Sequence, residues 1–235
     1  MTSAMDRAQA SAPGTPPAAD ATGATDDYRA VLHRSFETLY DSGRDSWTGE
    51  PAMRHLVELL GTRIEPGSHV LDIGAGRLRD TEVLLTAGHR VTAVDLVRLP
   101  EWERAAARWG ERVRFAAGDV RELAEGGALD VFDAVLDNGV LHHQLPEDHP
   151  GYLAALHGRL RPGGLLAVSL FARAETDTEG VLHTAGDGRL SREFTTAEAE
   201  AMLADAGFAV IAQRRVPRER PEWTYLLVLA RRGEG

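Results

Sequence analysis

Four acidic residues lie at or near the ends of apolar segments and could together bind a small polar ligand. They are Asp72, Asp95, Asp119 and Asp137. The turn Gly74-Ala75-Gly76 follows the first segment and lets the backbone approach a ligand without a Cβ in the way. Any one of these acids could merely cap the next helix. Their recurrence favours a nucleotide-type ligand.

The spacing of the acids suggests a ligand group for each. Asp95 lies about 20 residues beyond the glycine turn, where a ribose-binding acid is expected. The carboxylate of Asp119 could accept a hydrogen bond from the exocyclic amine of an adenine. Asp137 and Asn138 would then lie under the reacting group of the ligand.

The ligand is not expected to be a dinucleotide. The dinucleotide pattern requires glycine or alanine at its sixth position, where this chain has Arg79. Asp72 would also repel a pyrophosphate. A pocket lined by carboxylates instead stabilises a cationic ligand, such as one with a sulfonium and an amino group. The sequence therefore argues against a nicotinamide oxidoreductase.

The elements that position these residues alternate between strands and helices. Apolar segments predict strands over residues 69–74, 90–95, 113–117, 132–137 and 164–171, and helices over about 79–87, 101–109, 120–125 and 149–160. This βαβ order predicts a doubly wound α/β fold with a mostly parallel sheet, whose strand ends form one site. Two more strands, about 208–213 and 224–230, are joined by a short proline-containing connector. A crossover helix does not fit there, so the last strand should run antiparallel.

The remaining segments define the domain organisation. Residues 1–26 are mostly small or polar and are expected to be a disordered tail, followed by one domain over residues 27–235. Within it, residues 27–62 predict a small N-terminal helical cap. The polar stretch 173–193 is expected to be a long functional loop. Residues 195–198, Thr-Thr-Ala-Glu, are typical of a capping box that begins a helix.

Composition excludes several classes of protein. The 235 residues include no cysteine, which rules out disulfides, thiolate metal sites and a cysteine nucleophile. A net charge of −10 argues against a nucleic-acid partner, because such binding depends on clustered cations. No apolar run reaches the roughly 18 to 20 residues of a membrane span, and no signal peptide is recognisable. We expect a cytoplasmic protein with no membrane partner.

The ordered motifs resemble those of class I S-adenosylmethionine-dependent methyltransferases. They are Val70-Leu71-Asp72-Ile73-Gly74-Ala75-Gly76, Asp95, Gly118-Asp119-Val120, Phe132-Asp133-Ala134-Val135-Leu136-Asp137 and Leu160-Arg161-Pro162-Gly163-Gly164. The resemblance implies a Rossmann-like, seven-stranded sheet with an antiparallel last strand, and transfer of a methyl group from S-adenosylmethionine to an O, N, S or C atom of a small molecule. It assigns Asp72, Gly74, Ala75 and Gly76 to the methionine end, Asp95 and Leu96 to the ribose, Asp119 and Val120 to the adenine, and Asp137 and Asn138 to the methyl-donor side.

Residues 76–80, 87–91 and 137–143 look similar to the small-molecule branch that contains thiopurine S-methyltransferase and tellurite-resistance-type enzymes. An Asn-Pro-Pro-Tyr signature of enzymes that methylate bases is absent. The same motifs would serve a protein that binds the cofactor without methylating, or that uses it for a rearrangement or cyclisation. The motifs leave the acceptor and the oligomeric state open.

Two adjacent histidines are candidates for a general base. His142 and His143 follow the fourth strand, and one of them, with His143 preferred, could deprotonate the methyl acceptor, or both could simply pack beside the cofactor. Tyr28, Tyr40 and Trp47 of the helical cap, with His142, are candidate acceptor contacts, although ordinary packing would explain them as well. Without cysteine or a helical i, i+4 histidine pair, no metal site is expected.

Overall fold

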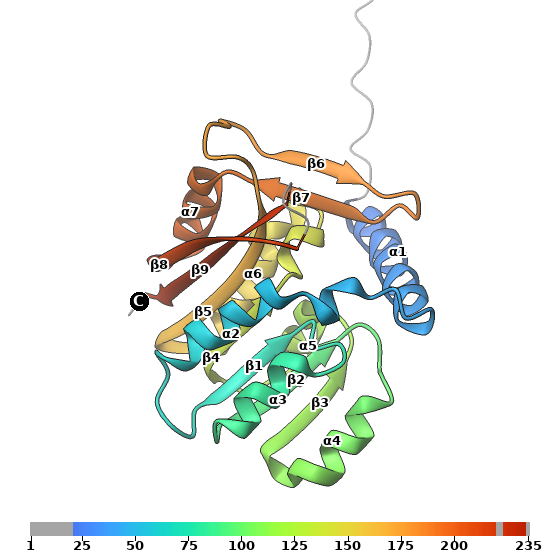
Figure 1. Cartoon of the computed structure of the whole chain (residues 1–235), viewed down its shortest axis with the longest axis vertical. Coiled ribbons are helices and arrows are strands. Elements are labelled where there is room, and N and C mark those ends of the chain that lie inside the picture. Colours follow the sequence, from blue (N-terminus) through green and yellow to red (C-terminus); the bar gives the residue numbers. More distant parts are fainter. Residues whose placement is uncertain (1–20, 220–222, 234–235) are drawn as a thin grey trace, which may run out of the picture.

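Five parallel strands form the centre of the sheet, as the apolar segments predict (Figure 1). They are β1 (His69–Ile73), β2 (Arg90–Asp95), β3 (Val113–Ala117), β4 (Phe132–Asn138) and β5 (Leu160–Ala172). The computed structural model describes residues 21–219 and 223–233. The spatial order is β3-β2-β1-β4-β5, so that the strand order reverses beside β1. The carboxyl ends of β1, β2 and β4 therefore meet at one edge, where doubly wound folds bind ligands.

The last two strands complete the sheet on its other side. β8 (Phe208–Pro217) pairs with β9 (Thr224–Arg232), and β9 also pairs with β5, in both cases antiparallel. The prediction of an antiparallel last strand is confirmed. With the five parallel strands, β8 and β9 account for the seven strands that the sequence resemblance implies. Two further strands, β6 and β7, extend the same sheet among the described residues.

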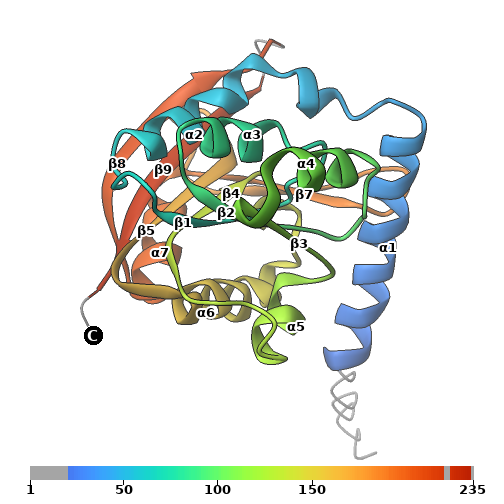
Figure 2. The same cartoon turned by 90° about the horizontal axis from the view of Figure 1, so that it is seen from below.

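Helices cover both faces of the sheet (Figure 2). One face carries α2 (Arg54–Gly61), α3 (Arg79–Thr86) and α4 (Glu101–Trp109), and the other carries α5 (Val120–Glu125), α6 (His149–Arg159) and α7 (Thr196–Asp205). Successive strand residues point to opposite faces, so Val70 packs in the first core and its neighbour Leu71 in the second. Both side chains are fully buried. A sheet with two covered faces explains why the strand segments are continuously apolar.

The N-terminal helix begins earlier than predicted. α1 spans Ala21–Asp41, whereas the sequence places residues 1–26 in a disordered tail; residues 1–20 of that predicted tail lie outside the described residues. The short helices η1 (Ser46–Gly49) and η2 (Pro51–Met53) lead from α1 to α2 and complete the predicted cap. No helix in the described ranges is long and apolar enough to cross a membrane.

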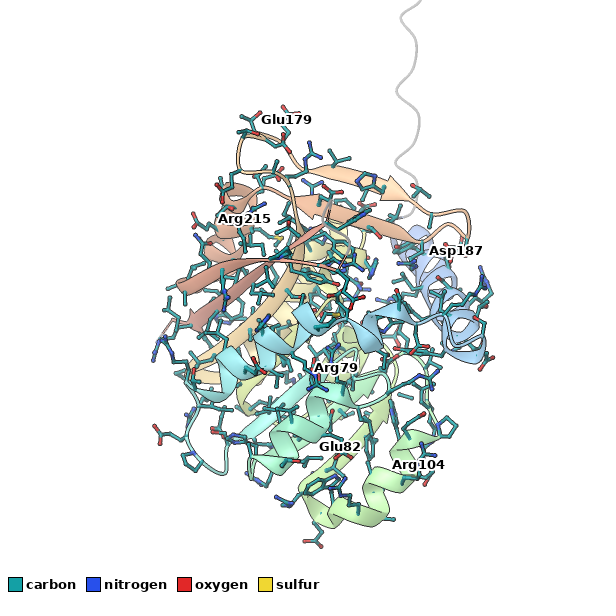
Figure 3. All side chains as sticks on the ribbon, in the orientation of Figure 1. Arg79, Glu82, Arg104, Glu179, Asp187 and Arg215 are labelled. Carbon is teal, nitrogen blue, oxygen red and sulfur yellow. The ribbon has the colours of Figure 1, made fainter. Side chains whose placement is uncertain are left out.

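The stretch 173–193, predicted as a loop, contains a β-hairpin. β6 (Val181–Thr184) and β7 (Leu190–Phe194) pair antiparallel, and β7 joins the end of β5 through Phe171↔Glu193 and Ala172↔Phe194. The strands are short and largely solvent-accessible, which removes the apolar signal that marks the other strands. The tip of the hairpin, with Asp187, lies beside α1 (Figure 3). A hydrogen bond of 2.6 Å from Ser35 Oγ to Asp187 Oδ2 joins the two.

The capping box predicted at residues 195–198 is confirmed and makes a testable contribution to stability. Thr195 Oγ1 accepts a hydrogen bond from Glu198 N, and the Glu198 carboxylate accepts one from Thr195 N. We expect Thr195→Ala to lower the free energy of unfolding by about 1 kcal/mol, because the Glu198 N–H at the start of α7 loses its acceptor, Thr195 Oγ1. Urea denaturation measures the change. Thr196→Ala, at the next position, is the control and should cost less than half as much.

Candidate active site

The glycine turn after β1 is held between β2 and β4. The N–H groups of Gly74 and Ala75 both donate to Val94 O, at 2.8 and 3.1 Å. Gly74 has φ +70°, and a Cβ on it would lie 2.4 Å from Cγ2 of Val140. Only glycine therefore allows the chain after β4 to pack against the turn. This packing brings the ends of β1 and β4 to one cavity.

Asp95 lines this cavity at the end of β2. Its Oδ2 accepts a hydrogen bond from Gly76 N and its Oδ1 accepts one from Val97 N, both at 2.9 Å. Burial raises the pKa of Asp95, while the backbone hydrogen bonds favour its ionised form. Tyr40 covers the turn from α1, since a Cβ on Gly76 would lie 2.7 Å from the Tyr40 hydroxyl. Asp95 thus ties the glycine turn to β2 and faces the cavity.

Asp119 lines the cavity but also caps α5, as the alternative interpretation predicts. Its Oδ1 accepts a hydrogen bond of 2.8 Å from Arg121 N, and the carboxylate forms ion pairs with the side chains of Arg121 and Arg29. Burial alone would raise the pKa of Asp119, but the hydrogen bonds and charges of Arg121, with the charge of Arg29, lower it. Asp119 is an ionised carboxylate at the cavity edge. Leu96 and Val120, next to the two acids, also line the cavity.

Asp72 lies behind the glycine turn rather than among the cavity-lining side chains. It is buried and accepts a hydrogen bond from Thr81 Oγ1. Burial, with the nearby charge of Asp80, raises the pKa of Asp72 to about 8. Arg79 pairs with Asp80 at 2.8 Å and lies between α2 and α3 (Figure 3). The structure therefore gives Asp72 a supporting position beneath the turn, where sequence reasoning expects a ligand contact.

Asp137 is likewise turned away from the cavity. Its carboxylate accepts hydrogen bonds from the N–H groups of Gly139, Val140 and Leu141, and a bond of 2.8 Å from the Tyr152 hydroxyl. Full burial raises the pKa of Asp137 to about 6, although these hydrogen bonds favour the ionised form. Asp137 thus fixes the turn after β4, and it does not line the cavity as the sequence suggests.

Asn138 presents an unpaired oxygen at the cavity. Its Nδ2 donates to Met53 O at 2.8 Å and to Asp80 Oδ2 at 2.6 Å, which fixes the orientation of the amide. Its Oδ1 is buried and has no hydrogen-bond partner among the described residues. A buried acceptor without a partner is costly unless a ligand supplies the donor. Asn138 lines the cavity together with Gly74.

Both candidate catalytic histidines line the cavity but are held in neutral form. His143 Nδ1 bonds to Leu190 O at 2.6 Å, and burial lowers the pKa of His143 to about 3, with the charge of Arg189 adding to the effect. His142 stacks on Phe171 with ring centroids 3.9 Å apart. Burial and the neighbouring His143 lower the pKa of His142 well below its ordinary value. Such groups are weak proton acceptors near neutral pH.

Some of the predicted acceptor contacts line the cavity, and one instead joins the elements around it. Tyr40 and Trp47 line the cavity, with ring centroids 5.6 Å apart. Tyr28 does not; its hydroxyl donates to His143 O at 2.7 Å and accepts from Leu190 N at 2.9 Å. Tyr28 therefore fastens α1 to β7 and to the turn after β4.

The cavity, of about 330 Å³, extends from the ends of β1 and β2 to a second end that the motifs do not mark. Aromatic and basic side chains line that second end. Those that sequence reasoning missed are Phe36, Phe171, Arg189, Ser191, Arg218, Trp223 and Tyr225. They come from α1, β5, the hairpin, the described ends of the β8–β9 connection and β9. For these residues, the sequence offers only a weak signal of a binding site, which is an aromatic residue near the end of a strand, such as Phe171.

A family model described as "Methyltransferase domain" matches residues 47–213. The match spans β1 to β7, the first part of β8 and most of the residues that line the cavity. The chain belongs to the class I S-adenosylmethionine-dependent methyltransferases. The predicted family, fold and cofactor are therefore confirmed. The finer likeness to thiopurine and tellurite enzymes stays a prediction.

Relatives of this methyltransferase act on varied molecules. The solved Burkholderia thailandensis 1,6-didemethyltoxoflavin-N1-methyltransferase, with 1,6-didemethyltoxoflavin and S-adenosylhomocysteine bound, is 44% identical, with a TM-score of 0.84 and coverage of 94% of both chains. Trans-aconitate 2-methyltransferase of Deinococcus radiodurans is 30% identical over 66% of this chain. Ubiquinone biosynthesis O-methyltransferase of Xanthomonas axonopodis is 34% identical over 50% of it. These alignments span 60% and 49% of the latter two enzymes.

The buried position of Asp72 gives the stability of this methyltransferase a pH dependence. A pKa near 8 in the folded chain, against 3.8 ordinarily, means that the folded state holds the proton more tightly. Stability from this group is present below pH 4 and is lost as the pH rises towards 8. The isosteric Asp72→Asn variant does not titrate. We compare the free energy of unfolding of this variant with that of the unaltered protein. We expect the difference to rise in favour of the variant by more than about 1 kcal/mol from pH 5 to pH 8.

Urea denaturation at the two pH values measures this change. The exposed Asp130→Asn substitution serves as control, and its stability difference from the unaltered protein should stay constant. A constant difference for Asp72→Asn would contradict the expectation.

Proposed function

We propose that this chain methylates a ring nitrogen of a small, flat heterocycle, with S-adenosylmethionine as methyl donor. The observation that carries the proposal is the 44% identity, over 94% of both chains, to an N1-methyltransferase solved with such an acceptor bound. The aromatic lining of the second end of the cavity supports it, because flat rings pack well against aromatic side chains.

The residues at the first end of the cavity fit the cofactor. When bound, S-adenosylmethionine supplies an electrophilic methyl group on a sulfonium. We assign Asp95 to the ribose hydroxyls and Asp119 to the adenine end, since both carboxylates line the cavity. The unpaired Oδ1 of Asn138 is suited to accept a hydrogen bond from the cofactor's ammonium group. Asp72 and Asp137 support this end without lining it.

The second end of the cavity has the properties of an acceptor site. Phe171 lies at its centre, with the ring of His142 at 3.9 Å, that of Trp223 at 5.5 Å and that of Tyr225 at 5.6 Å. Methyl transfer from a sulfonium needs alignment and exclusion of water more than acid–base help. A ring held against this aromatic cluster would be aligned in this way. No contact in the cavity favours the alternative of a cofactor-binding protein that does not methylate.

Methyl transfer is tested directly with 1,6-didemethyltoxoflavin as acceptor. We expect the protein to convert it to a product heavier by one methyl group while S-adenosylhomocysteine accumulates in equal amount, as measured by mass spectrometry. A reaction mixture without acceptor is the control and should show much slower formation of S-adenosylhomocysteine. Absence of an N-methylated product from this compound and from a panel of flat heterocycles with ring N–H groups would refute the proposal.

The assignment of Asp95 is tested through cofactor binding. We expect Asp95→Asn to weaken binding of S-adenosylhomocysteine by about 10- to 100-fold, because a hydrogen bond to a charged acceptor contributes about 1.5–3 kcal/mol. Isothermal titration calorimetry measures the affinity, and thermal denaturation checks the fold. Asp130→Asn removes the same charge at an exposed site and should leave the affinity unchanged. Equal affinity of Asp95→Asn and the unaltered protein would contradict the assignment.

A further inference from the structure

Two arginines at the acceptor end of the cavity belong to none of the family motifs. Arg189 precedes β7, and Arg218 follows β8; both line the cavity. The charges of both contribute to the lowered pKa of His142, after burial and the neighbouring His143. The two guanidinium groups are therefore near the same ring, although they come from separate parts of the chain.

Arg218 lies against three aromatic rings and retains an unused donor. Its guanidinium carbon is 5.1 Å from the centroid of Tyr225, 5.3 Å from that of Phe171 and 5.8 Å from that of Trp223. Its Nε is 3.8 Å from a carboxylate oxygen of Glu50, which is too long for a hydrogen bond, and has no hydrogen-bond partner among the described residues. A buried N–H of this kind is satisfied when a ligand provides an acceptor.

Arg189 reaches the acceptor end from the hairpin. Its Nε donates to Ser35 Oγ at 3.1 Å, and its guanidinium carbon lies 5.5 Å from the centroid of Phe36. Its Nη1 is 3.4 Å from Nε2 of the neutral His143. These contacts hold the guanidinium at the cavity wall. Among the described residues, no carboxylate is hydrogen-bonded to this guanidinium.

One carboxylate lies near each of these arginines without a hydrogen bond to its guanidinium among the described residues. Glu50 faces Arg218 from the segment before η2, and Asp187 faces Arg189 from the hairpin tip. Arg79, whose charge acts on Tyr225, is paired with Asp80 and adds no net charge on the side of Arg218. The histidines and tyrosines near these arginines are neutral near pH 7: the two histidines have lowered pKa values, and burial raises the pKa values of Tyr28 and Tyr225 to about 12.

The same wall lacks a group suited to remove a proton from the acceptor. His143 has a pKa of about 3, and its Nδ1 is bonded to Leu190 O. The carboxylate of Asp137 does not line the cavity. Asp95 and Asp119 line the cofactor end. A cavity wall that carries cations but no base favours a ligand that is already deprotonated.

We propose that Arg189 and Arg218 bind the methyl acceptor as its anion, a flat heterocycle that has lost a ring N–H proton to water before it enters the cavity. This inference rests on the proposed function, whose acceptor class it specifies. The anionic nitrogen uses its lone pair to form the bond to the methyl carbon, the carbon–sulfur bond breaks, and its electron pair stays on sulfur. One negative and one positive charge disappear, so that a dry cavity favours the step.

The test follows the ionisation of bound 1,6-didemethyltoxoflavin in the unaltered protein. The conjugated probe is titrated with pH in the presence of saturating S-adenosylhomocysteine, and its absorbance spectrum reports the anion. We expect the pKa of the bound probe to lie at least about one unit below that of the free probe, because a cation within about 4–6 Å lowers such a pKa by 1–3 units. An equal or higher pKa in the bound state would overturn the inference.

Two variants and a matched control assign the effect to the arginines. Arg189→Gln and Arg218→Gln should each raise the pKa of the bound probe and weaken its binding several-fold or more near neutral pH. Arg214→Gln removes an exposed charge from β8 and should change neither quantity. Unchanged pKa and affinity in both cavity variants would refute the role of the arginines. If the variants fail to fold, as judged by circular dichroism, the titration of the unaltered protein still decides.

The outcomes also separate this inference from the proposed function. A probe that binds in its neutral form and is still methylated would overturn only the anionic acceptor. Failure of the protein, while it still binds S-adenosylhomocysteine, to bind this probe or any member of the panel of flat heterocycles at any pH would overturn both the anionic acceptor and the proposed function.

Discussion

The buried carboxylate of Asp137 holds the turn on which both ends of the cavity depend. It accepts hydrogen bonds from backbone N–H groups of this turn and from the Tyr152 hydroxyl. The turn carries Asn138 at the cofactor end and His142 at the acceptor end, and its Val140 packs on Gly74. A shift of this single carboxylate would move all of these groups together. Burial raises the pKa of Asp137, which reflects the free energy needed to hold an ionised carboxylate at this position.

The two ends of the cavity are built in different ways. The end that we assign to the cofactor consists of turns that follow parallel strands, and the sheet register fixes the positions of these turns. The acceptor end is assembled from α1, the hairpin and the β8–β9 connection, which approach from separate directions (Figure 1). Side-chain contacts join these pieces, notably those of Tyr28 and of Ser35 with the hairpin. A binding frame fixed by the sheet and a separately built acceptor wall suit a family whose members share one cofactor.

Signals that are local in sequence predicted the fold well. Continuous apolar segments marked β1 to β5, and the connector after β8 implied an antiparallel β9. The hairpin was missed because its strands are short and partly exposed, so that no apolar period marks them. The start of α1 was also missed, because small residues in a tail and in a helix look alike in composition.

The candidate site was predicted only in part, because side-chain direction depends on tertiary contacts. Asp95 lies at the cavity as expected. Asp72 follows the same kind of signal, yet its side chain points to Thr81 behind the turn. Asp119 is both a helix cap and a cavity residue, and the sequence could not show that distant Arg29 would pair with it. Arg189 and Arg218 carry no motif at all, so their meeting in one cavity depends on the assembled fold.

The attachment of the hairpin has an evolutionary consequence. β7 joins β5 through two residue pairs at the strand end, beyond most of the length over which β5 pairs with β9. Insertions, deletions or exchanges in residues 181–194 can therefore alter the acceptor wall while the seven-stranded sheet keeps its alignment. Descendants of one ancestral gene could acquire new acceptors by replacing this appendage, with the cofactor end inherited unchanged.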